Sequence, residues 1–177
     1  MIKKIENNLR EFVYGGMDGA VTTFAIVTGA AGAALGSNVI LILGLANVLA
    51  DGFSMAVGAY LSEKADQQLE AKNKGEEVDE ADSPLEASIA TFISFILVGF
   101  VPLIVYIVDY IFDLGLGDDA LVYSVFLTLA AFAGIGYLRA VITHIDKAKS
   151  ILESLGLGIA AAIISYSVGN IIERIIS

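Results

Sequence analysis

Residues 16–30 read GMDGAVTTFAIVTGA, an apolar run of small residues in which Asp18 is the one ionisable side chain. The run continues to Leu35, which gives the ~20 residues that an α-helix needs to cross a ~30 Å hydrocarbon layer. A carboxylate at the centre of such a span costs about 3 kcal/mol on insertion scales, so it normally faces a bundle interior or an aqueous path. Asp18 is therefore the first candidate for a functional residue.

The composition of the whole chain predicts an integral membrane protein. Hydrophobic residues make up 56% of the 177 residues and the mean hydropathy is +0.77, more than a soluble domain of this length can bury. The apolar segments are continuous and do not alternate with period two, so the predicted fold class is all-α rather than a β-barrel. The chain has no cysteine, so any metal site must use carboxylate, thioether, amide or carbonyl ligands.

Five apolar segments are long enough to cross a bilayer, and we predict transmembrane helices at residues 16–35, 38–61, 85–112, 120–139 and 155–172. Residues 1–14 place apolar and charged side chains on opposite faces of a helix, which predicts an amphipathic N-terminal helix at the membrane interface. The remainder, residues 15–177, is predicted to form one five-helix transmembrane domain with a short acidic cytosolic loop at 62–84. Pro102 lies inside the third span and predicts a kink there.

The positions of lysine and arginine predict the orientation of these spans. If five spans exist, every basic residue except Arg174 falls on the same side of the membrane. Basic residues are retained on the cytoplasmic side, so the N-terminus and the acidic loop are predicted to be cytoplasmic. Much of the net charge of −10 belongs to that loop, because nine of the twenty acids lie between Glu63 and Glu86.

Small residues recur along the predicted spans, as expected where helices pack closely in a bilayer. The glycines expected to allow such contacts are Gly29, Gly32, Gly36, Gly52, Gly58, Gly134, Gly136, Gly156 and Gly158. Five thin helices make a poor enclosed pathway. A two-fold homodimer with both copies of the first span at its axis is the expected completion.

Three residues of the second span, Asn47, Asp51 and Met55, are spaced i, i+4, i+8 and share one helix face. Counted from the first turn at ~1.5 Å per residue, Asp18 and Met55 lie at the same depth, and Asp51 lies one turn further into the hydrocarbon. Carboxylate oxygens with one thioether suit Fe²⁺ or Mn²⁺ better than Ca²⁺ or Mg²⁺. These four residues are the predicted metal site within the membrane.

Each of these residues also has a purely structural interpretation. Asp18 could cap the first transmembrane helix by accepting backbone N–H bonds at the interface. Asp51 could be a neutral, protonated acid that is hydrogen-bonded within the bundle, and Met55 could fill the core.

A second group of acids follows the second span. Glu63, Asp66 and Glu70 are spaced i, i+3, i+7, which places them on one face of a cytosolic extension of that helix. They are predicted to collect cations at the entrance, and the alternative is a merely solvated face. A distal acidic cluster at residues 76–82 precedes Ser83 and Pro84, which are predicted to begin the third span.

The same stretches resemble a known family. MDGAVTTFAIVTGAAGA (residues 17–33) and ANVLADGFSMAVGAYLSEKAD (residues 46–66) are similar to the DG-x-x-(T)-x-F-A and SM-x-x-G-x-YLS motifs of the vacuolar iron transporter family. The resemblance implies a homodimer that moves ferrous iron, and often manganese, out of the cytosol in exchange for protons. It also implies that Asp18 and Met55 line the path at the dimer interface. Many members carry an acid where this chain has Asn47, and Asp51 is the expected substitute.

The leading functional interpretation is therefore a divalent cation exporter for Fe²⁺ or Mn²⁺, driven by proton exchange. A passive divalent cation channel and a non-transporting membrane scaffold are the alternatives. The chain has no phosphate loop, nucleophile–base pair or nucleic-acid surface, so we expect no enzyme activity, no nucleic-acid partner and no cofactor beyond the transported ions Fe²⁺, Mn²⁺ and H⁺. The short loop favours a prokaryotic plasma membrane by analogy.

Overall fold

The computed structural model describes residues 2–75 and 83–176, and its side chains from residue 9 onward. All the regular structure in these two segments is helical, as the composition predicted. The elements are α1 (Ile2–Gly32), α2 (Ser37–Lys74), α3 (Pro84–Gly99), the short 3-10 helix η1 (Val101–Leu103), α4 (Ile104–Phe112), α5 (Asp119–Thr143) and α6 (Lys147–Ile176). The distal acidic cluster that the sequence singled out at residues 76–82 lies outside the described residues.

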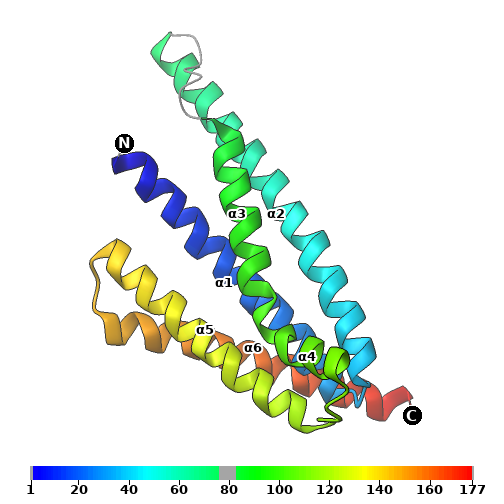
Figure 1. Cartoon of the computed structure of the whole chain (residues 1–177). Helices are drawn as coiled ribbons and strands as arrows, with labels where there is room; N and C mark the ends of the chain where they lie inside the picture. Colours follow the sequence, from blue (N-terminus) through cyan, green and yellow to red (C-terminus); the bar gives the residue numbers. More distant parts are fainter. Residues whose placement is uncertain (1, 76–82, 177) are drawn as a thin grey trace.

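Helix α1 is the centre of the bundle, since it contacts α2, α3, α5 and α6. Figure 1 shows that one end of the molecule, at the upper left, holds the N-terminus, the C-terminal end of α2, the start of α3 and the α5–α6 turn. The α1–α2 turn, the α4–α5 turn and the C-terminus gather at the other end, at the lower right. The chain therefore reverses direction between successive long helices, with η1 and α4 continuing the direction of α3.

Four helical segments are long and apolar enough to cross a membrane: α2, the stretch Pro84–Phe112 that contains α3 to α4, α5 and α6. Their outer faces carry large apolar side chains that are exposed in the single chain, among them Phe53 at 65% and Phe126 at 68%. A protein in water would bury such surfaces, whereas a bilayer solvates them, so the chain is an integral membrane protein.

Helix α1 is not among these four segments, because glycines, threonines and Asp18 interrupt its apolar sequence. Its role in the fold is that of a buried core helix, with Ala20 and Val27 fully enclosed by the helices around it. The fifth span that the sequence predicts at residues 16–35 remains a prediction.

Residues 2–14 form no separate element, because α1 continues without a break from Ile2 to Gly32. A location of this segment at the membrane interface remains a prediction. At the other end of α1, a short turn with Ala34 at φ 53° leads directly into α2, so the two helices run antiparallel.

The third span is interrupted where Pro102 predicted a kink. Helix α3 ends at Gly99, and η1 separates it from α4, because proline has no N–H for the helical ladder. The break leaves the Pro102 carbonyl free to accept a hydrogen bond of 2.6 Å from the buried hydroxyl of Ser124 in α5. The kink is therefore held in place by a neighbouring helix.

Glycines on α1 bring the other helices close. A Cβ at Gly19 would overlap the backbone carbonyl of Phe95 in α3, and one at Gly32 would overlap that of Tyr166 in α6. Close packing through Gly29, Gly32, Gly136 and Gly158 is thus confirmed. The same prediction is wrong for four glycines, because a Cβ at any of them would have nothing within 4 Å: Gly36, Gly58, Gly134 and Gly156.

Candidate functional site

Asp18 lies within α1, sixteen positions after the first helical residue, Ile2. Only the first four N–H groups of a helix are free for capping, so Asp18 cannot cap this helix. The structural interpretation of Asp18 as an N-cap is wrong. Its backbone carbonyl accepts a hydrogen bond of 2.9 Å from the hydroxyl of Thr22, while its partly buried carboxylate accepts none from the described residues.

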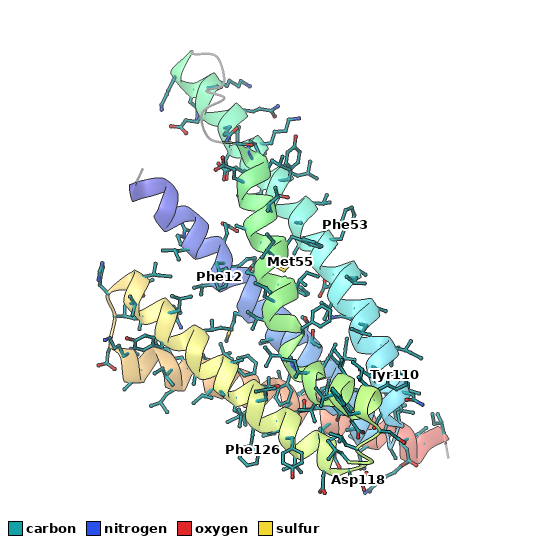
Figure 2. All side chains as sticks on the ribbon, viewed as in Figure 1. Phe12, Phe53, Met55, Tyr110, Asp118 and Phe126 are labelled. Atoms are coloured by element: carbon teal, nitrogen blue, oxygen red, sulfur yellow. The ribbon has the colours of Figure 1, made fainter. Side chains whose placement is uncertain are left out.

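Asp51, Asn47 and Met55 lie on one face of α2, all partly buried. Each is followed in the sequence by a buried residue, which is Val48, Gly52 or Ala56. These three buried residues belong to the face of α2 that packs on the neighbouring helices. Met55 and the exposed Phe53 project from opposite sides of α2 (Figure 2). The polar residues thus run along the edge of the packed face of α2.

The structure brings Asp18 and Asp51 together across the contact between α1 and α2. Asp51 is close enough for its negative charge to act on the Asp18 carboxylate. Two neighbouring carboxylates in a protein of low dielectric repel strongly, and a cation or a proton between them removes that repulsion. The pair is therefore suited chemically to hold a divalent cation or to exchange it for protons.

Two buried polar atoms of the same two helices have no hydrogen-bond partner in the described part of the chain. They are the hydroxyl of Thr23 in α1 and the amide nitrogen of Asn47 in α2. Thr28 of the same helix donates to the Phe24 carbonyl at 2.8 Å, so an unpaired threonine hydroxyl is not a general property of α1. Such groups normally bind a water or an ion.

The sequence reading missed Thr23, because nothing in the sequence separates it from the neighbouring Thr22. Its position is set by packing against α3, since a Cβ at Gly99 would lie 3.3 Å from the Thr23 hydroxyl and 3.4 Å from a methyl of Val48. Thr23 thus lies where α1, α2 and α3 meet. It faces the side of α2 that carries Val48, the residue next to Asn47 in the sequence.

A further acid was also missed. Glu11 lies two helical turns before Asp18, and its carboxylate accepts a hydrogen bond of 3.1 Å from the Thr91 hydroxyl in α3. The two residues are eighty positions apart, so only the packing of α1 on α3 reveals this contact. The face of α1 that carries Asp18 therefore has a second, hydrogen-bonded carboxylate nearer the N-terminal end.

The acids of the α2 extension lie on helix α2, which continues to Lys74. Glu63 accepts a hydrogen bond of 3.3 Å from Gln67, and Glu70 forms an ion pair with Lys74. Within the described residues, no three acids or histidines lie close enough together to hold a metal ion. Cation collection by Glu63, Asp66 and Glu70 remains a prediction.

A family comparison bears on all of these residues. A family model described as "VIT family" matches residues 9–83 and 71–170 of this chain. The chain belongs to the VIT family. The matched ranges contain Asp18, Asn47, Asp51 and Met55 together with most of every long helix.

Named relatives of this VIT-family chain include "Vacuolar iron transporter homolog 3" of Arabidopsis thaliana, which is 30% identical over 172 residues, 93% of this chain and 82% of the relative. "Vacuolar iron transporter 1" of the same plant is 22% identical over 94% of this chain and 86% of its own length. "Vacuolar iron transporter" of Toxoplasma gondii is 43% identical over 79 residues, 44% of this chain. The chain covers only 26% of that Toxoplasma protein. These relatives are named as transporters, not as enzymes.

Proposed function

We propose that this protein exports divalent transition-metal cations, Fe²⁺ or Mn²⁺, from the cytosol in exchange for protons. The observation that carries the proposal is the placement of two acids, Asp18 and Asp51, on contacting helices of a membrane protein, with Asp51 close enough for its charge to act on Asp18. Membership of a family whose relatives are named iron transporters supports a metal ion as the cargo. Intramembrane acids of this kind mark ion pathways and proton relays.

The cargo is inferred from the chemistry of the donors. Asp18 and Asp51 supply hard oxygen ligands, and Met55 and Asn47 on the same face of α2 supply a thioether and an amide. This mixed set suits borderline cations such as Fe²⁺ and Mn²⁺. Water or the equivalent residues of a second copy completes the coordination shell, so the proposed transporter is a two-fold homodimer.

Proton exchange follows from the same pair. When the metal leaves, two unscreened carboxylates remain side by side in a medium of low dielectric, which is unfavourable. Uptake of a proton removes that repulsion and resets the site. The chain itself then couples the outward movement of metal to the inward movement of protons.

The direction of export rests on orientation. The end of the molecule that holds the N-terminus and the α5–α6 turn also carries the basic residues, and basic residues favour the cytoplasmic side. The extended end of α2, with Glu63, Asp66 and Glu70, then lies in the cytosol and collects cations at the entrance. The proposed location is a prokaryotic plasma membrane.

The test is metal uptake into proteoliposomes that contain the purified protein, with and without an imposed pH gradient. We expect uptake of Fe²⁺ and Mn²⁺ that increases when the gradient drives protons in the opposite direction. Uptake that follows only the membrane potential would instead indicate a passive channel. Uptake equal to that of empty liposomes for both metals would indicate a non-transporting scaffold and would overturn the proposal.

A further inference from the structure

A pocket of about 300 Å³ lies between α1, α5 and α6, at the end of the molecule that holds the N-terminus and the α5–α6 turn. Its lining includes Arg10, Val13 and Met17 from α1, Ile135 and Arg139 from α5, and Leu157 from α6. Asp18, Asp51 and Met55 do not line it. The pocket is therefore separate from the proposed metal path.

Two guanidinium groups give this pocket a positive charge. Arg139 forms an ion pair of 2.9 Å with Glu153, and both side chains are partly exposed. Arg10 has no ion pair with any side chain that the structure describes. Among the side chains that the structure describes, one carboxylate thus opposes two arginines, and guanidinium groups bind phosphate oxygens through paired hydrogen bonds.

The remaining wall is apolar. Val13 and Met17 lie one helical turn apart on the face of α1 that also carries Arg10, and Ile135 and Leu157 close the pocket from α5 and α6. A ligand that satisfies both parts needs an anionic head and a hydrocarbon tail. The volume is at the lower end of the range for small-ligand pockets, which fits a phosphate head with the first part of one chain.

We propose that this pocket binds an anionic phospholipid, with its phosphate between Arg10 and Arg139 and one acyl chain along Val13, Met17 and Leu157. The charge distribution assigns this end of the molecule to the cytoplasmic side, where anionic lipids are held by basic pockets between transmembrane helices. The lipid bridges α1 to the α5–α6 pair at the end of the bundle that holds the N-terminus. Its binding does not depend on which ion the protein transports.

The test is native mass spectrometry of the purified full-length chain in detergent, titrated with phosphatidylglycerol or with phosphatidylcholine of the same chain length. We expect selective retention of phosphatidylglycerol. Arg10→Ala and Arg139→Ala should each weaken its retention by about ten-fold, the loss expected for one charged hydrogen-bond partner. Arg174→Ala, at the opposite end of the molecule, is the matched control and should change nothing.

Two more variants test separately how the phosphate head and the acyl chain contribute to binding. Glu153→Gln releases Arg139 from its ion pair and should strengthen the retention of phosphatidylglycerol, while Leu157→Trp fills the apolar wall at an exposed position and should weaken it. Equal retention of both lipids, or equal losses in Arg10→Ala and Arg174→Ala, would overturn the proposal. Binding of free glycerol 3-phosphate as tight as that of the lipid would also overturn it, because the site would then recognise a soluble phosphate.

Discussion

Asp51 in α2 lies close enough to Asp18 in α1 for its charge to act on the Asp18 carboxylate across the contact between two antiparallel helices. Neither residue caps a helix end, because Asp18 is deep within α1 and Asp51 is in the middle of α2. A membrane protein that keeps two acids together in this way needs a partner charge for them. In the proposed transport cycle, a transported cation and a counter-proton supply that charge in turn.

The thioether of Met55 is predicted to contribute to metal affinity and not to stability. Met55→Leu keeps the volume of the side chain but removes the sulfur ligand, so the apparent affinity for Fe²⁺ or Mn²⁺ should fall. The melting temperature should stay close to that of the wild type, because a volume-conserving exchange costs less than about 1.5 kcal/mol. Both quantities can be measured on the same detergent-solubilised sample, and an unchanged metal affinity would remove Met55 from the path.

The packing of α1 on α5 is predicted to depend on one aromatic pair. The rings of Phe24 and Phe132 meet edge to face with 6.2 Å between centroids, and both side chains are buried. Phe132→Ala should lower the free energy of unfolding by about 3 kcal/mol or more, because it leaves a cavity in the core. Phe126→Ala on the exposed face of the same helix is the control and should cost little (Figure 2).

Close approach of α1 and α6 is predicted to require Gly32. A methyl group there would overlap the backbone carbonyl of Tyr166, which cannot move away without shifting the helix. We expect Gly32→Ala to destabilise the protein by about 1–3 kcal/mol, as overpacking does. Gly134→Ala adds the same methyl where nothing lies within 4 Å, and thermal unfolding should show no loss for this variant.

The interruption of the third span at Pro102 is predicted to be stabilised by the hydroxyl of Ser124. Ser124→Ala removes the 2.6 Å hydrogen bond and leaves a buried carbonyl without its partner, at a cost of about 1–3 kcal/mol. Ser167→Ala on an exposed part of α6 provides the comparison. Equal melting temperatures for the two variants would show that the carbonyl finds another partner.

The fold was largely predictable from local patterns. The apolar runs indicated the helices, Pro102 indicated the interruption of the third span, and the spacing of Glu63, Asp66 and Glu70 indicated that α2 continues beyond its apolar part. These signals are local, because each depends on a few neighbouring residues and on helical geometry. The continuity of α1 through residues 2–32 was missed, since a change from amphipathic to apolar pattern looks like a boundary in sequence.

The candidate site was predictable only in part. Asp18 and Asp51 stood out because acids are rare in apolar runs, and the helix register placed them at related depths. Thr23 and Glu11 carried no such signal. Their environments are created by α3, through Gly99 and Thr91, and the sequence does not say which helices pack together.

The most direct measurement is pH-driven metal flux into proteoliposomes for Asp18→Asn beside Asp118→Asn. Asp18→Asn keeps the shape of the side chain but can neither carry a negative charge nor exchange a proton, whereas Asp118 lies in the exposed turn before α5 (Figure 2). We predict that Asp18→Asn abolishes flux of both Fe²⁺ and Mn²⁺ while the protein stays folded, and that Asp118→Asn transports like the wild type. Wild-type flux in a folded Asp18→Asn variant would show that Asp18 is not part of a cation path.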